Sequence, residues 1–304
     1  MPGNEQLAID LARMTLGELG ELELRKFPDG ETYVRIISDV GGKDVYIVCT
    51  LARPDTRFLA LTFVAAAIKD LACRRLQLIA PYLAYMRQDR IFRPGEALTS
   101  RLFAQQLQQH FDGLITVDPH LHRHASLEEV YDISTRVVHA GPLLAAWIVE
   151  NVADPIIIGP DAESAQWAEG IARDASAPWA VFNKKRHGDR LVQMAAADLG
   201  HLAGRTPVLV DDIISSGATM RVALRLLAAQ GLPAAYCLAV HALCGAKTAT
   251  SLRSHTAAFL TSNTVPNADA ALDVAPLIGH ELIRASADSS IVAAGLQDGR
   301  GCRR

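Results

Sequence analysis

An apolar run that ends in two acidic residues and a small, hydroxyl-rich loop constrains this chain more than any other feature. Val208–Val210 is followed by Asp211 and Asp212, then by the loop Ser215–Thr219 and the helix-like Met220–Ala229. This order predicts a buried strand, a phosphate-binding loop and a helix, because such a loop turns N–H groups, hydroxyls and a helix N-terminus toward one phosphate. The acidic pair would repel that phosphate and is better suited to sugar hydroxyls or a magnesium ion. Together they predict a phosphorylated sugar as ligand, with an ordinary capped βα turn as the alternative.

Short β-rich runs alternate with longer Ala- and Leu-rich segments along the chain. The expected elements are Val45–Val48, Arg57–Leu71, Leu76–Ala80, Leu98–His110, Leu114–Val117, Gly141–Val152, Ile156–Ile158, Ala162–Arg173, Val208–Val210, Met220–Ala229, Tyr236–Val240 and Phe259–Leu260. Apolar strands separated by helices predict an α/β fold with mostly parallel sheets flanked by helices and right-handed connections. A length of 304 residues favours about two domains, so we expect one over 1–141 and another over 142–304, each with its own sheet.

Composition narrows the possible partners and location. The net charge of −3 argues against a nucleic-acid partner, which normally requires a basic field. No apolar run approaches the roughly 20 residues that span a bilayer, and the first ten residues lack the pattern of a signal peptide. We therefore expect a cytoplasmic protein with no membrane partner.

Acidic residues and a histidine follow three of the expected strands. Asp118 and His120 come after the strand ending at Val117, Asp161 follows the strand at 156–158, and the pair Asp211–Asp212 follows the third. Parallel sheets bind their ligands at the carboxyl ends of their strands, so these side chains predict one ligand-binding edge.

Two further segments suggest how a nucleotide would be held. Arg87, Gln88, Asp89 and Arg90 follow the strand at 76–80, and forked guanidinium groups match the oxygens of a polyphosphate. Gln88 and Asp89 would then contact a base or ribose, and a solvated loop with internal ion pairs is the alternative. The segment Phe27–Glu31 is, on its own residues, a turn leading into a strand over 32–37.

A basic run and a set of alternating histidines leave two interpretations open. Asn183–Arg190 lies between strand-like segments at 179–182 and 191–194, as either solvated surface or a cationic loop that closes over phosphates. His120, His122 and His124 are spaced to share one face and form a transition-metal site. A magnesium site with one histidine and acidic partners fits the neighbouring phosphate chemistry better.

In order along almost the whole chain, these segments resemble those of the ribose-phosphate pyrophosphokinase family. The matching segments are Phe27–Glu31, Tyr85–Arg90, Asp118–His120, Gly159–Asp161, Lys184–Arg186 and Asp211–Thr219. The resemblance implies two domains of phosphoribosyltransferase type and a magnesium-dependent reaction. In that reaction ATP donates its pyrophosphoryl group to ribose 5-phosphate, giving phosphoribosyl pyrophosphate and AMP. It also implies a homo-oligomer built from dimers, such as a hexamer.

The resemblance also implies roles for individual residues. ATP would be held by Phe27, Asp29 and Glu31, reaching a neighbouring subunit's site, and by Arg87, Gln88, Asp89 and Arg90. Magnesium would be bound by His120 and Asp161, and the transition state stabilised by Lys184 and Arg186. The ribose hydroxyls would be bound by Asp211 and Asp212, and the 5-phosphate by Ser215, Ser216, Gly217, Ala218 and Thr219.

Some positions depart from the family pattern. Glu163 and Ser164 stand where the family usually has two glycines, so we expect side chains there to crowd or recharge the site. The chain around His120 also differs from the commonest form. Two alternatives to the synthetase follow: a catalytically silent regulatory paralogue, which would fit the lost glycines, and a simple phosphoribosyltransferase, which would be shorter and lack the two cationic segments.

Overall fold

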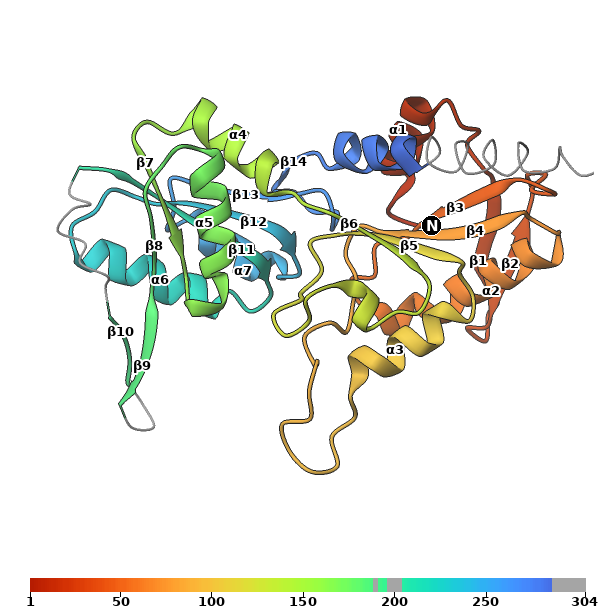
Figure 1. The fold of residues 1–304 in the computed structure, drawn as a ribbon, viewed down its shortest axis with the longest axis horizontal. Helices are drawn as coiled ribbons and strands as arrows, with labels where there is room; N and C mark the ends of the chain where they lie inside the picture. Colours follow the sequence, from red (N-terminus) through yellow and green to blue (C-terminus); the bar gives the residue numbers. More distant parts are fainter. Residues whose placement is uncertain (188–190, 196–203, 286–304) are drawn as a thin grey trace, which may run out of the picture.

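Two parallel sheets lie side by side along the long axis of the molecule (Figure 1). The structure is a computed structural model that describes residues 1–187, 191–195 and 204–285, with the backbone alone for 183–187 and 191–195. The first sheet has the order β3 (Asp44–Val48), β4 (Arg75–Ala80), β5 (Gly113–Val117) and β6 (Ser134–Val138). The second has the order β14 (Ala270–Leu272), β13 (Ala258–Ser262), β12 (Tyr236–Ala242), β11 (Thr206–Ile214), β7 (Pro155–Gly159) and β8 (Trp179–Val181).

Helices cover both faces of each sheet, as continuous apolar strands require. The helices are α1 (Glu5–Thr15), α2 (Phe58–Asp70), α3 (Thr99–Gln108), α4 (Gly141–Asn151), α5 (Ala165–Asp174), α6 (Ala218–Ala229) and α7 (Ala246–Arg253). In the first sheet, α2 and α3 pack on one face and α1 on the other. In the second sheet, α6 and α7 share a core on one face, and α4 and α5 pack on the opposite face. The α/β fold with helix-flanked parallel sheets is therefore confirmed.

The described elements also include three short 3₁₀ turns and two hairpins. The 3₁₀ turns are η1 (Pro54–Thr56), η2 (Leu127–Glu129) and η3 (Ala162–Ser164). One hairpin pairs β1 (Leu22–Lys26) with β2 (Thr32–Ile36), so Phe27–Glu31 is the turn that the sequence predicts. The other pairs β9 (Asn183–His187) with β10 (Leu191–Ala195) and projects from the second sheet (Figure 1).

Two expected boundaries differ from the observed ones. The basic run was expected to connect two strands, but most of it is itself strand β9, with His187 opposite Leu191. Strand β11 continues to Ile214, so Asp211 and Asp212 lie within its C-terminal half rather than after it. The strand is longer because its pairing with β12 continues to the last pair, Ile214 opposite Ala242.

The chain returns to the first sheet after completing the second. A helical segment over residues 275–285 places Ile278 and Leu282 in the same core as Leu7 and Leu11 of α1. Glu281 in this segment binds Arg136 of β6, with 2.6 Å between Oε1 and Nη1. The last described segment therefore ties the two halves together, and the division at 141/142 stays a prediction.

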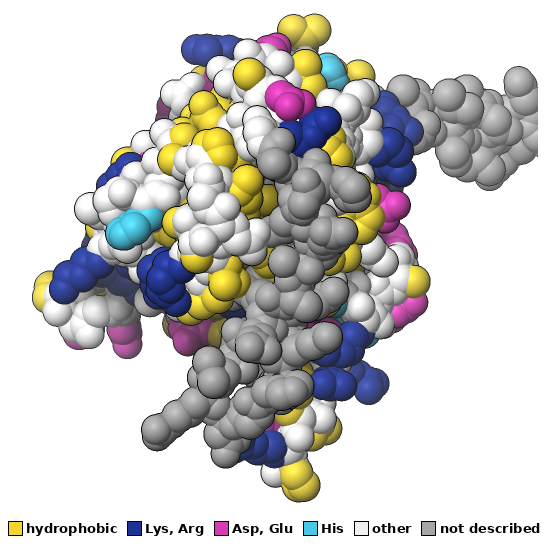
Figure 2. Space-filling view, turned by 90° about the vertical axis from the view of Figure 1, so that its left-hand side faces the viewer, with side chains coloured by type: hydrophobic (Ala, Val, Ile, Leu, Met, Phe, Trp, Pro, Cys, Tyr) yellow, Lys and Arg dark blue, Asp and Glu magenta, His cyan; other side chains and the backbone are white. Residues whose placement is uncertain are grey.

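On the end of the molecule formed by the second sheet, basic, acidic and apolar side chains are interspersed (Figure 2). Among the described residues, no helix has the length and apolar character needed to traverse a lipid bilayer.

Candidate active site

A polar cleft at the carboxyl ends of the strands brings together residues from both halves of the chain. It is lined by Arg87, His120, His122, Asp161, Glu163 and the segment 211–220. Arg87 follows β4, the histidines follow β5, Asp161 follows β7, and the segment 211–220 runs from β11 into α6. Parallel strands present their ligand-binding loops at this edge. The structure therefore brings His120, Asp161, Asp211 and Asp212 together at one edge, without Asp118, and ligand binding there stays a prediction.

The two adjacent acids of β11 have opposite electrostatic environments. Burial, and then the charges of Asp212 and Asp161, raise the pKa of Asp211 well above its ordinary value. Burial, the largest single cause, would raise the pKa of Asp212 too, but the hydrogen bond and charge of His120, together with the charges of His122 and His241, lower it. The His120 Nδ1 and Asp212 Oδ2 atoms are 2.9 Å apart. The pKa values of the two adjacent carboxyls are thus shifted in opposite directions by their surroundings.

The phosphate-loop segment enters α6 through a glycine that other residues could not replace. Gly217 has φ of +67°, and a Cβ built on it would lie 2.7 Å from Cγ2 of Thr248. Ser216 Oγ accepts a hydrogen bond from the N–H of Ala218 at 3.3 Å, and its backbone oxygen accepts one from Arg221 at 3.0 Å. The first-turn N–H groups of α6 lie beside these hydroxyls, which is the arrangement that binds anions. Arg221, which the sequence analysis did not single out, adds a cation next to the loop.

The turn that carries His120 is held by buried polar contacts. Asp118, at the end of β5, has φ of +34°, a left-handed conformation that costs energy for a residue with a side chain. Its carboxylate accepts a 2.7 Å hydrogen bond from the N–H of Ala140 and contacts His139 at 2.9 Å. The His241 imidazole from β12 meets the carbonyl oxygens of Val117 and Asp118 from across the junction of the sheets.

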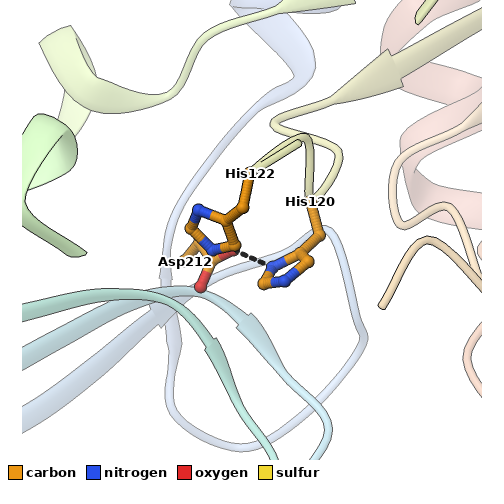
Figure 3. A group of neighbouring side chains, drawn as sticks. All are labelled: His120, His122 and Asp212. Atoms are coloured by element: carbon orange, nitrogen blue, oxygen red, sulfur yellow. Dashed lines mark hydrogen bonds and ion pairs between the residues drawn. The ribbon is translucent and has the colours of Figure 1, made fainter. Parts of the chain in front are cut away.

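Of the three alternating histidines, two point into the cleft. The ligand atoms of His120, His122 and Asp212 all lie within 4.8 Å of one another (Figure 3). His124 is directed away and contacts Glu129, with 3.1 Å between Nδ1 and Oε2. Burial, and then the charge of the neighbouring His120, lower the pKa of His122. The sequence left the choice between these histidines open, and the structure separates His124 from the other two.

The two side chains that replace the usual glycines behave differently. Ser164 is 4% exposed and caps η3, with its Oγ 2.6 Å from the backbone oxygen of Asp161. A Cβ on Gly159 would lie 2.5 Å from Oγ of Ser164, so Gly159 makes room for the serine. Ser164 therefore stays out of the cleft, whereas Glu163 lines it and adds negative charge.

Among the predicted nucleotide-binding residues on the segment after β4, only Arg87 lines this cleft. Its Nη1 lies 3.4 Å from the hydroxyl of Ser215, which joins the two halves of the site. Asp89 is turned inward with a side chain 1% exposed, and both its oxygens bind Arg123. Arg90 stacks its guanidinium on the ring of Phe92, 4.6 Å from the centroid. Gln88 does not line the cleft, so nucleotide contacts of these residues stay predictions.

The remaining predicted residues lie away from the cleft or outside the described side chains. Phe27, Asp29 and Glu31 sit on the β1–β2 turn, where Gly30 donates to the Phe27 oxygen at 2.9 Å. Lys184 and Arg186 are on the backbone of β9, but their side chains lie outside the described residues. Their predicted roles are untested by this geometry.

The donor groups of the cleft suit a divalent cation. Three aspartates and Glu163 converge on it, and only Arg87 among its lining residues carries a fixed positive charge. Oxygen-rich sites of this kind match Mg²⁺, and the histidines add nitrogen donors that other divalent ions accept. A metal ion would offset the carboxylate charges that raise the pKa of Asp211.

Comparison with known proteins agrees with a two-domain fold of phosphoribosyltransferase type. The family model for the N-terminal domain of ribose phosphate pyrophosphokinase matches residues 1–110, and that for the phosphoribosyl transferase domain matches residues 127–276. A solved phosphoribosylpyrophosphate synthetase of Mycobacterium smegmatis superimposes with a TM-score of 0.80 at 25% identity, covering 93% of this chain and 96% of that chain.

The sequence relatives carry the assignment further. The ribose-phosphate pyrophosphokinase of Saccharolobus solfataricus is 35% identical over 230 residues, which cover 74% of this chain and 77% of the relative. That of Methanopyrus kandleri is 34% identical over 270 residues, 88% of this chain and 91% of the relative. This chain belongs to the ribose-phosphate pyrophosphokinase family, as the resemblance of its motifs indicates.

Proposed function

We propose that this ribose-phosphate pyrophosphokinase carries out its reaction in the cleft between Arg87 and Asp212. ATP donates its pyrophosphoryl group to the anomeric hydroxyl of ribose 5-phosphate, and phosphoribosyl pyrophosphate and AMP are released. The observation that carries this assignment is the contact between the halves: Arg87 Nη1 lies 3.4 Å from Ser215 Oγ. Arg87, which follows strand β4 of the first sheet, thereby faces the segment Ser215–Thr219, which follows strand β11 of the second sheet.

Ribose 5-phosphate would occupy the β11–α6 side of the cleft. Its phosphate would be bound by the segment Ser215–Thr219 and the start of α6, where N–H groups and hydroxyls meet. Its ring hydroxyls would donate hydrogen bonds to the carboxylate oxygens of Asp211 and Asp212, which lie side by side in the cleft. Two adjacent acidic side chains suit the hydroxyls of a sugar and would repel a second phosphate.

ATP would approach from the first sheet. Arg87 would bind its phosphates, with Gln88, Asp89 and Arg90 on the same segment. Phe27, Asp29 and Glu31 would complete the adenine side of a neighbouring subunit's site in a homo-oligomer built from dimers. The expected cytoplasmic location matches these two water-soluble substrates.

Magnesium would be held by His120 and Asp161 and, when bound, neutralises charge on the transferred phosphates. The sugar's anomeric oxygen attacks the β-phosphorus in line, and AMP leaves. The protein's part is positioning and charge: Arg87 orients the phosphates, the acidic pair orients the sugar, and Lys184 and Arg186 offset the charge of the transition state. No covalent intermediate with the protein is needed.

The test is an assay of product release by the whole protein with magnesium, ATP and ribose 5-phosphate. We expect AMP and phosphoribosyl pyrophosphate in equal amounts, and Lys184→Ala to lower kcat by about 100-fold or more with little change in KM. Lys69→Ala, on the surface of α2, is the control and should leave both constants unchanged. Substrate binding without turnover would favour the regulatory paralogue, and activity only with a base and phosphoribosyl pyrophosphate would favour the transferase.

A further inference from the structure

Arg221, near the start of α6, folds back over the loop Ser215–Thr219 that precedes this helix. Its Nη1 donates a 3.0 Å hydrogen bond to the backbone oxygen of Ser216. Side chains of a helix lean toward its N-terminus, so a long residue at this position reaches the preceding loop. Gly217 leaves space for the guanidinium, because a Cβ there would lie 3.2 Å from the same Nη1.

The guanidinium of Arg221 lies in an electrostatically unfavourable place. The N-terminus of a helix carries a partial positive charge, which attracts anions and repels cations. The first turn of α6 contains no acidic residue, and its N-cap residue is Gly217, which has no side chain to accept from the N–H groups there. Among the side chains that the structure describes, no carboxylate pairs with Arg221. Two sources of positive potential therefore meet at the loop, and an anion from outside the chain would offset both.

We propose that Arg221 is a positioning residue for the phosphate of ribose 5-phosphate, which holds the Ser216 peptide in place and makes the loop select a doubly charged anion. This role rests on the proposed function, in which the loop binds that phosphate. Arg221 does not itself line the cleft, so it acts through Ser216 and through its charge.

The loop is held from two sides. Arg87 lies 3.4 Å from the hydroxyl of Ser215, and Arg221 binds the carbonyl oxygen of the next residue at 3.0 Å. In a trans peptide the C=O of one residue and the N–H of the next point in opposite directions. The N–H of Gly217, a residue that lines the cleft, is thereby directed away from the guanidinium. Holding the carbonyl of Ser216 thus also fixes the direction of a donor at the edge of the cleft.

A phosphate ester is the anion that this arrangement fits best. It carries a charge of about −1.5 to −2 at pH 7, whereas a sulfate ester of similar shape carries a single negative charge. The attraction between a fixed cation and a ligand grows in proportion to the charge of the ligand. Arg221 should therefore contribute more to the binding of a phosphate ester than to that of a sulfate ester.

Arg225 provides a matched control on the same helix. It is exposed and lies four residues further on, about 6 Å along the helix axis from Arg221. Replacing it removes a guanidinium from nearly the same face of α6 without touching Ser216. Two replacements of Arg221 then separate charge from hydrogen bonding, because Arg221→Lys keeps the charge and Arg221→Gln keeps a donor without the charge.

The experiment is isothermal titration calorimetry of the full chain with ribose 5-phosphate and with ribose 5-sulfate, in the absence of ATP. Arg221→Gln should raise the Kd for the phosphate ester by about tenfold, because a charged donor is replaced by a neutral one, and should raise the Kd for the sulfate ester less. Arg221→Lys should bind the phosphate ester within about threefold of the unmodified chain, since the charge remains. Arg225→Gln should bind both esters like the unmodified chain.

An unchanged Kd for ribose 5-phosphate in Arg221→Gln would overturn the proposal. Equal weakening of both esters would overturn it too, because a purely structural role does not depend on the charge of the ligand. Circular dichroism checks that each variant folds, and Arg221→Met takes the place of Arg221→Gln if that variant does not.

Synthesis of phosphoribosyl pyrophosphate is assayed separately with the same variants. The loss in Arg221→Gln should appear in the KM for ribose 5-phosphate, with kcat within about twofold of the unmodified enzyme. Synthesis with the same KM in every Arg221 variant would reject this role alone. The expected differences in binding without any synthesis would support the role and reject only the proposed reaction, and no binding of ribose 5-phosphate by the unmodified chain would reject both.

Discussion

The buried imidazole of His241 should be worth several kcal/mol to the junction that supports the cleft. The residue is 1% exposed, and its Nε2 lies 3.1 and 3.3 Å from the carbonyl oxygens of Val117 and Asp118. Because both neighbours are acceptors, Nε2 carries a proton, and Nδ1 lies 2.9 Å from the hydroxyl of Thr264 in a second hydrogen bond. The side chain therefore makes hydrogen bonds to both halves of the chain.

His241→Phe keeps an aromatic ring beside Tyr82, whose centroid is 5.0 Å away, but removes both polar atoms. One donor and one acceptor are lost in a buried place, and each group left without a partner costs about 1–3 kcal/mol. We expect the free energy of unfolding to fall by about 2–4 kcal/mol, part of the loss being offset by the retained packing. Urea denaturation measures it, and His255→Phe on the surface should stay within about 0.5 kcal/mol.

The same substitution should also change how stability depends on pH. Burial lowers the pKa of His241 from its ordinary value of 6.5, so the folded chain keeps the ring neutral where the unfolded chain takes up a proton. The unfolded state then binds more protons below pH 6.5, and the stability of the unmodified protein falls as pH falls. The difference between the two proteins should shrink from pH 7.5 to 5.5. A loss below about 1 kcal/mol, or a difference independent of pH, would refute the reasoning.

Two other substitutions test local features of the site. Gly217→Ala should weaken binding of ribose 5-phosphate in calorimetry, because its Cβ would meet Thr248 at 2.7 Å. The control is Gly231→Ala, where φ is +72° but no atom lies within 4 Å of the new Cβ. It should lower the free energy of unfolding by only about 1 kcal/mol and leave binding intact. Arg123→Leu should lower stability by about 1–3 kcal/mol in thermal denaturation, because it strands the Asp89 carboxylate, which is 1% exposed. Adding Asp89→Asn should recover part of this loss, and no recovery would argue against the pair.

The strands and helices were accessible from the sequence because their signals are local. The run at 208–210 and the Ala-rich helices encode burial through periodicity alone, and each expected element is present within a few residues. Strand β11 is longer than its apolar run because hydrogen bonding to β12 holds Asp211 and Asp212 in extended backbone. That pairing depends on the neighbouring strand, so the residues of β11 alone do not predict it.

The site was only partly accessible, because its contacts join distant residues. The strand-end rule placed His120, Asp161 and the acidic pair at one edge, but the bond between His120 and Asp212 spans 92 positions. The sequence predicts that the Asp89 carboxylate contacts a ligand, yet both its oxygens bind the guanidinium of Arg123, 34 residues further along the chain. Spacing predicts which edge a residue joins, whereas tertiary packing decides its partner.

The junction between the sheets therefore determines whether the cleft exists at all. The sugar-side groups lie at the end of β11 and in the loop after it, and the histidines follow β5, so neither sheet alone assembles the lining. The relative position of the sheets is fixed by buried contacts such as Thr50 Oγ1 to the backbone oxygen of Thr264 at 2.5 Å, and by the return of residues 275–285 onto α1. Because these contacts are buried, a substitution at the junction should shift one sheet relative to the other. The residues that line the cleft would then move apart, although none of them is itself substituted.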